Sequence, residues 1–391
     1  MESWPVRPPL IVLLCALIFT TTFPIGAFPA LLPELGRAGL ADWALGLVAG
    51  AFGLARLVAD VPVGLFLTHH LRRALVLGPL LISAGVLLLA SDGPLAVLAL
   101  GRACQGVGHA LTIVAGLTAI LRYQATGALG AALGAYELAA MLGMLGGTVA
   151  LGLLPTGLAW PAAFLLACAP QGLGLLVAPA VLAALPPAPS AGRAPLFARG
   201  ARTTGRAAPV TRPVVLAFGA GAAIALAYAT LEQFVIPLRA GREFGLGRAG
   251  VARLLALTQV VDIACLVPFG ALADRRGVRP VLGAVLLAFA LGVGCVAFGD
   301  FPLLVLGCGL FGVGMAGWTL PLGLLRAATP PEQIGWRTAL YRLGVDGGIF
   351  LGPTVAGLLS GTAPGALAAL EAVALALVGL AVLAEHRARG G

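Results

Sequence analysis

Charged residues are scarce in this chain, and lysine is absent altogether. Only 10% of the 391 residues are charged, and all 24 basic residues are arginine. A water-soluble domain would carry about a quarter charged residues, so the composition excludes that class. The net charge of +9 would suggest nucleic acid as a partner of a soluble protein. Here the arginines are concentrated between long apolar runs, so we predict that they set membrane orientation and that the protein binds no nucleic acid.

Patterns that indicate enzymes or metal sites are also missing. All six cysteines fall inside apolar runs, and none forms a Cys-x-x-Cys pair, so they are interpreted as small buried residues. The sequence shows no zinc-ligand spacing, no phosphate-binding loop and no catalytic triad. We therefore predict that the protein is not an enzyme and that it uses no metal ion or cofactor.

Apolar residues dominate what is present. They make up 60% of the chain, and the mean hydropathy is +1.03. This composition predicts an all-α polytopic membrane protein, because spanning helices satisfy their own backbone hydrogen bonds in lipid. Apolar runs of sufficient length predict about twelve spans. The predicted spans are residues 10–33, 43–67, 74–90, 94–121, 127–154, 160–185, 213–238, 248–273, 280–299, 301–325, 335–360 and 364–384.

A break rich in Pro, Ala, Gly and Arg separates two groups of six predicted spans. We expect an N-terminal bundle at residues 1–185, a linker at 186–212 and a C-terminal bundle at 213–391. The distribution of arginines favours cytoplasmic termini and a cytoplasmic linker. The localisation that follows is the cell (inner) membrane, with the lipid bilayer as surroundings and a monomer as the expected form.

The two groups of spans repeat each other. A shift of 206 positions places Pro62 on Pro268 and the Gly-Val-Gly of residues 106–108 on that of 312–314. A shift of 205 places Tyr136, Gly143 and Gly147 on Tyr341, Gly348 and Gly352. Glycines in register across several spans predict two pseudo-symmetric six-helix bundles, an architecture of alternating-access transporters.

A polar segment between the eighth and ninth spans, GALADRRGVRP at residues 270–280, predicts a tight cytoplasmic turn. It resembles the loop signature of the major facilitator superfamily, a Gly-x-x-x-Asp-Arg-x-Gly-x-Arg turn. In its first-half counterpart, residues 64–73, Thr68 replaces the usual Asp and Leu71 the usual Gly. The resemblance implies a gating loop that includes Gly270, Asp274, Arg275, Gly277 and Arg279, and it implies that the second-half loop carries the cytoplasmic latch largely alone.

Three further motifs strengthen the resemblance to this superfamily and its twelve-helix drug:proton antiporter branch. LGRACQGVGHA, residues 100–110, looks like the fourth-helix motif. MLGMLGG, residues 141–147, resembles the fifth-helix Gly-Pro-x-x-Gly-Gly signature of proton-coupled drug exporters, with Met144 in place of the proline. LGPTVAG, residues 351–357, keeps a Gly-Pro pair in the eleventh span. The residues expected to pack helices closely are Gly106, Gly108, Gly143, Gly146, Gly147, Gly352 and Pro353.

Ionisable side chains inside predicted spans are candidates for proton coupling or substrate binding, because they are expensive in lipid. Arg102 either favours the deprotonated form of a neighbouring proton-carrying group or stabilises one conformation by pairing with a helix carbonyl group. Arg56 and Asp60 are four residues apart, so they either pair with each other or bridge to the other half of the protein. Arg342 and Asp346 repeat that spacing. The remaining candidates are carboxylates at Asp262, Glu232 and Glu137, and Glu232 is also placed where a solvated glutamate would be ordinary.

These features predict a secondary transporter that exports small, partly apolar molecules in exchange for protons. A proton-coupled importer or facilitator of a small metabolite is the first alternative, because Met144 departs from the exporter signature. A membrane sensor or partner protein that has lost transport is the second.

Overall fold

The computed structural model describes residues 8–124, 128–186, 210–330 and 333–390, and its regular structure there is entirely helical. Ten helical stretches in these residues are long and apolar enough to cross a membrane. One of them, Asp42–Ala90, is two helices that run together across a kink. Ile334–Leu359 adds a further helix of 26 residues. The described chain therefore agrees with twelve spans. The predicted linker at 186–212 lies mostly outside the described residues.

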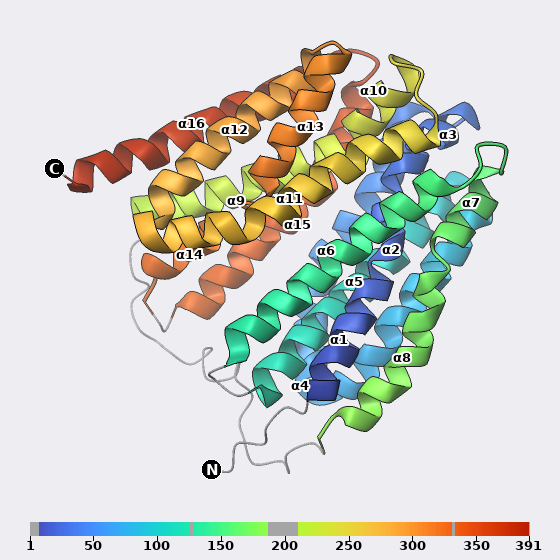
Figure 1. The fold of residues 1–391 in the computed structure, drawn as a ribbon, viewed down its shortest axis with the longest axis horizontal. Helices are drawn as coiled ribbons and strands as arrows, with labels where there is room; N and C mark the ends of the chain where they lie inside the picture. Colours follow the sequence, from blue (N-terminus) through green and yellow to red (C-terminus); the bar gives the residue numbers. More distant parts are fainter. Residues whose placement is uncertain (1–7, 125–127, 187–209, 331–332, 391) are drawn as a thin grey trace. The chain divides into compact units, whose positions relative to one another are not determined.

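The chain divides into two compact units (Figure 1). The first unit comprises Met1–Ala191 and Pro237–Ala256, so it takes in a short segment from the second half of the sequence. Its helices are α1 (Pro8–Thr21), α2 (Phe23–Ala27), η1 (Pro29–Leu31), α3 (Leu32–Arg37), α4 (Asp42–Ala90), α5 (Leu95–Tyr123), α6 (Leu129–Leu153), α7 (Trp160–Ala167) and α8 (Pro170–Ala184), with most of α10 (Ile236–Arg242) and the start of α11 (Arg248–Arg276).

The second unit comprises Gly192–Ile236 and Leu257–Gly391. The span from Arg212 to Arg242, which belongs to this unit as far as Ile236, changes helix type in the middle, because the π-helical turn η4 separates α9 from α10. The helices of this unit are α9 (Arg212–Thr230), η4 (Leu231–Val235), the larger part of α11, α12 (Val278–Phe298), α13 (Phe301–Met315), α14 (Leu320–Ala327), α15 (Ile334–Leu359) and α16 (Ala366–Gly390).

Prolines break the first span into short helices. α2, η1 and α3 each carry a proline in their first two positions, and a proline inside a helix removes a hydrogen bond and clashes with the preceding turn. Hydrogen bonds to and from α6 support this broken backbone. The Thr148 hydroxyl donates to the Gly26 carbonyl oxygen at 2.9 Å, and the Thr22 hydroxyl of the first span donates to the Ala140 carbonyl oxygen at 3.0 Å.

The two turns related by the repeat have different structures. Gly277 is the only residue between α11 and α12, and its φ of 87° is one that glycine adopts without strain. Leu71 occupies the equivalent position in the first half. Its side chain disfavours positive φ, and here the chain stays helical and only kinks at His70. The second-half turn is also shorter than its sequence suggests, because Asp274 and Arg275 lie in the last turn of α11.

Helix packing inside each unit follows the sequence repeat. A Cβ atom at Gly106 would overlap the Phe52 carbonyl oxygen of α4, and one at Gly312 would overlap the Thr258 carbonyl oxygen of α11. Residues 52 and 258 are themselves separated by 206 positions, the repeat shift. The same backbone approach therefore occurs twice, once in each bundle, which is the pseudo-symmetry that the matched glycines predict.

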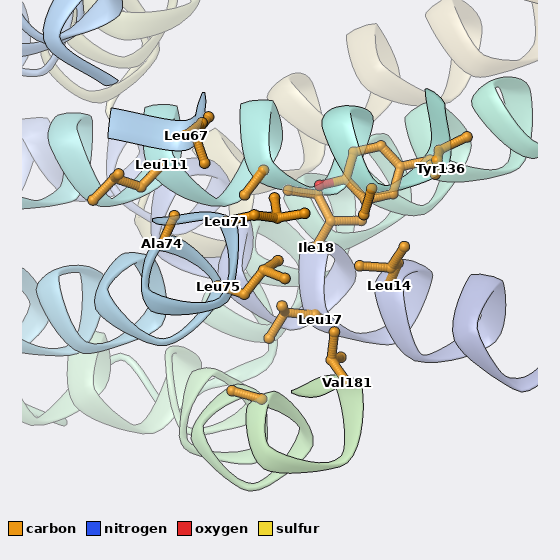
Figure 2. Close-up of a cluster of buried hydrophobic side chains, with 14 of the residues drawn as sticks. Leu14, Leu17, Ile18, Leu67, Leu71, Ala74, Leu75, Leu111, Tyr136 and Val181 are labelled. Carbon is orange, nitrogen blue, oxygen red and sulfur yellow. The ribbon is translucent and has the colours of Figure 1, made fainter. Parts of the chain in front are cut away.

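Apolar side chains from α1, α4, α5, α6 and α8 form a buried core of the first unit (Figure 2). Leu14 and Ile18 of α1 lie beside Tyr136 of α6, and Leu71 and Leu75 of α4 complete the cluster. Tyr136 is fully buried, and its hydroxyl donates to the Thr112 carbonyl oxygen of α5 at 3.1 Å. The phenol thus fills the core while its one polar atom is satisfied.

Candidate functional site

Arg102 is the largest fully buried polar side chain of the first unit. Its guanidinium carbon lies 4.0 Å from the ring centroid of Phe28 and 4.9 Å from that of Phe52. Its Nη1 donates to Oε1 of Gln105, one turn later on α5, at 3.0 Å. Aromatic faces attract a cation through their quadrupole, and this attraction is stronger where water is excluded. The site therefore holds a permanent positive charge between two rings.

Phe52 also contacts two other ionisable groups. The guanidinium carbon of Arg56, one turn later on α4, lies 5.8 Å from the Phe52 ring centroid. The imidazole of His109 lies 5.8 Å from the same ring, centroid to centroid. Arg56 and Asp60 are both half-buried on α4. The Phe52 ring therefore lies near both Arg102 and Arg56, two candidate residues that come from different predicted spans.

The fifth-helix motif lies against the broken first span. Cβ atoms at Gly143 and Gly147 would overlap the carbonyl oxygens of Phe19 and Phe23, and one at Gly146 would lie 2.7 Å from the Phe23 ring. Small residues allow this backbone contact between membrane helices. Glu137 is half-buried on the same helix, one residue after the buried Tyr136.

Glu232 is the buried carboxylate of the π-helical turn η4 in the second unit. Nε2 of Gln259 on α11 donates to its Oε1 at 3.2 Å. Gln233 and Thr258, the neighbours of these two residues, are buried as well. Single π-helical turns occur frequently at functional sites, and Pro237 after the turn has no N–H to continue regular hydrogen bonding. Glu232 is therefore not the solvated glutamate that its place in the sequence also allowed.

Tyr228, one turn before this carboxylate on α9, belongs to an aromatic pair. The rings of Tyr228 and Trp318 meet edge to face, 5.8 Å apart. Asp262 follows Gln259 by three residues on α11 and is half-buried. Asp346 is fully buried on α15. The second unit thus carries carboxylates on η4, α11 and α15 and amides on η4 and α11. Its aromatic pair comes from α9 and from the segment between α13 and α14.

Arg248, at the start of α11, is a buried ion-pair partner within the first unit. Its Nε and Nη2 donate to the two carboxylate oxygens of Glu34 at 2.9 and 2.6 Å. Its guanidinium also donates to the Leu158 carbonyl oxygen at 2.9 Å. A few residues earlier, Arg242 makes a second bidentate pair with Asp42, at 3.0 and 2.6 Å. The segment 237–256 is therefore fastened to the first unit by two arginines.

Family comparison decides the class of the protein. A sequence model of the Major Facilitator Superfamily matches residues 10–247 and 233–389. The chain belongs to the major facilitator superfamily. This membership makes it a membrane transporter rather than an enzyme. No curated protein sequence matches the chain.

Solved structures share the fold of this superfamily member at low sequence identity. A point mutant of the nucleoside transporter NupG is 14% identical with a TM-score of 0.71, and the alignment covers 96% of this chain and 99% of that one. A POT family transporter in complex with a thioalcohol-conjugated peptide is 15% identical with a TM-score of 0.77, covering 98% of each chain. A bacterial homolog of the human lysosomal transporter Spinster is 16% identical with a TM-score of 0.75, covering 98% and 95%.

Several contacts of this superfamily member could not be predicted from its sequence. Phe28 and Phe52 look like ordinary core residues, and Arg248 looks like an outer-loop arginine. Glu371 on α16 is buried and accepts a hydrogen bond from Thr230 at 2.6 Å. The sequence feature that could have identified Glu371 is that it is a single carboxylate inside the last apolar run. By contrast, the hydroxyls of Thr20 and Thr21 donate to carbonyl oxygens of their own helix.

Proposed function

We propose that this transporter exports small, partly apolar molecules in exchange for protons, and that Glu232 carries the proton. The observation that supports it is the placement of Glu232, a buried carboxylate that accepts a hydrogen bond from the neutral amide of Gln259. A charged carboxylate is expensive in such surroundings and a protonated one is not. Protonation of Glu232 would therefore lower the free energy of the state in which this carboxyl group is buried, and loss of the proton would raise it.

The neighbouring side chains support the proposed substrate class. Tyr228 and Trp318 offer aromatic surface one turn from Glu232. A site that combines aromatic faces with a few polar groups suits a molecule with an apolar body and one hydrogen-bonding or cationic group. The fixed charge of Arg102 is proposed to contribute to coupling from the first unit, where Phe28 and Gln105 hold it.

Proton coupling is tested with purified protein in liposomes that carry a preformed pH gradient. A pH-sensitive dye inside reports whether addition of ethidium, a partly apolar cation, dissipates the gradient. We expect dissipation with the native chain and none with Glu232→Gln, which keeps the shape of the side chain but binds no proton. The matched control is Glu243→Gln, because Glu243 is an exposed glutamate that pairs with Arg239 in the same region of the chain. Full dissipation by Glu232→Gln would refute the assignment of the proton to this residue.

The direction of transport is tested separately. Met144 stands where the exporter signature has proline, and this difference favours the importer alternative. A strain that overproduces the protein should survive higher concentrations of toxic apolar cations if it exports them. Unchanged resistance, together with faster growth on a limiting nutrient, would support the importer. A non-transporting sensor would be supported if the native chain gave no phenotype in either assay and the Arg102→Ala variant behaved in the same way.

The cellular arrangement completes the proposal. The arginine distribution supports an inner-membrane location with both termini in the cytoplasm. We further propose that the protein acts as a monomer. A reporter that is active only in the cytoplasm, fused after Gly391, tests the orientation, and light scattering of the purified protein tests the monomer.

A further inference from the structure

Glu371 is buried on the second turn of α16, and its surroundings do not neutralise a charge. Its exposed fraction is 2%. Its Oε1 accepts the hydrogen bond of the Thr230 hydroxyl at 2.6 Å, whereas its Oε2 is buried with no hydrogen-bond partner among the described residues. A carboxylate with one neutral donor and one unsatisfied oxygen is expensive to keep charged. A bound proton removes that charge.

The ionisable groups around Glu371 do not offer an alternative partner. The helices that pack on α16 are α9, α12 and α15. None of their ionisable side chains forms a hydrogen bond or ion pair with Glu371 in the described part of the chain. The ionisable side chains on these three helices, on η4 and on α16 itself are Arg212, Tyr228, Glu232, Arg279, Cys295, Arg337, Tyr341, Arg342, Asp346, Glu385 and His386.

The hydrogen bond from Thr230 to Glu371 joins two helices, unlike the usual hydrogen bond of a threonine in a membrane helix. Threonine hydroxyls in membrane helices commonly donate back to their own helix, as the buried Thr112 does to the Gly108 carbonyl oxygen at 2.9 Å and the half-buried Thr354 does to that of Phe350 at 2.7 Å. Thr230 instead donates across to α16. Gly352 of α15 leaves room for it, because a Cβ there would lie 2.8 Å from the Thr230 hydroxyl oxygen.

We propose that Glu371 and Thr230 form a second proton-binding site, which exchanges a proton with water independently of Glu232. The carboxyl group takes up one proton on Oε2 and returns the same proton, while Thr230 stays bonded to Oε1. Glu371 lies five residues after the start of α16, about 8 Å along the helix axis, so the path to the aqueous loop is short. Thr230 immediately precedes η4, so this site adjoins the turn that holds Glu232.

Infrared difference spectroscopy on the purified full chain in lipid nanodiscs tests the site without any substrate. The pH-dependent C=O band of a protonated carboxylic acid should lose one component in Glu371→Gln. Thr230→Val should shift that component to higher frequency, because its carbonyl loses a hydrogen bond, and Thr230→Ser should leave it in place. A Glu371→Gln spectrum that superimposes on the native one would overturn the proposal.

Two further arms keep the outcomes separate. Glu232→Gln should remove a different component, so loss of the proposed function and loss of this site are read from different bands. If Glu371→Gln does not fold, Thr230→Val decides, and the absence of any shifted pH-dependent band overturns the site. The titration is repeated with choline in place of sodium. A component that follows sodium rather than pH would overturn proton binding in favour of cation binding.

Discussion

Replacing Arg248 with methionine should destabilise the protein far more than the same change at Arg242. Both arginines lie in the segment 237–256 and both form bidentate pairs with a carboxylate of the first unit. They differ in burial. The side chains of Arg248 and Glu34 are 1% and 16% exposed, whereas those of Arg242 and Asp42 are 44% and 29% exposed. Each therefore serves as the control for the other.

The magnitude follows from this difference in burial. Removing one partner of a buried ion pair costs about 3–5 kcal/mol, because the remaining charge stays uncompensated. Glu34 keeps some contact with solvent, so we expect about 3 kcal/mol for Arg248→Met, including the lost donor to the Leu158 carbonyl oxygen. An exposed pair contributes about 0.2–1 kcal/mol, so Arg242→Met should cost about 0.5 kcal/mol.

Unfolding in mixed micelles of rising dodecyl sulfate content, followed by tryptophan fluorescence, measures both variants. Glu34→Gln, alone and combined with Arg248→Met, completes a double-mutant cycle, and the pair should couple by about 2 kcal/mol because they share one buried contact. Equal losses for Arg248→Met and Arg242→Met, or a coupling energy near zero, would refute the argument that burial makes the Glu34 pair strong.

Three other predictions concern backbone approach, the turn and the buried cation. Gly147→Ala should destabilise the protein by about 1–3 kcal/mol in the same unfolding assay, because a Cβ there meets the Phe23 backbone, whereas Gly134→Ala on the same helix has open space and should be neutral or slightly stabilising. Gly277→Ala should cost about 1–2 kcal/mol through its positive φ, and a loss no larger than that of an exposed helical Gly→Ala change would contradict this reason. Arg102→Lys keeps the charge but loses the planar stacking, so it should cost about 2 kcal/mol, and native stability would show that the aromatic contacts contribute little.

The span boundaries were largely predictable from the sequence. The fourth predicted span, 94–121, corresponds to Leu95–Tyr123, and the sixth, 160–185, to Trp160–Ala184. The reason is that the bilayer demands long apolar helices wherever the chain crosses it. The turn between the second and third spans was different. Without a glycine at position 71, the chain continues as a kinked helix there, although its charged residues resemble those of a loop.

The pairing of polar groups could not be predicted in the same way. Arg102 was identified from its type and position, but an apolar helix without a marked polar face gives no indication of which helix its side chain meets. Phe28 and Phe52 come from two other spans. Glu34 and Arg248 are 214 residues apart in the chain, and Glu371 and Thr230 are 141 apart.

The sequence by itself determined that this protein is a helical membrane transporter built from repeated bundles, because composition, apolar run length and glycine register are properties of the linear chain. Only the tertiary structure decided that Glu232 meets Gln259, that Arg102 lies between two aromatic rings and that Glu371 is bonded to Thr230. The physical reason is that a buried polar group must find its partner across a helix interface, and the close packing of those helices selects which side chains meet there.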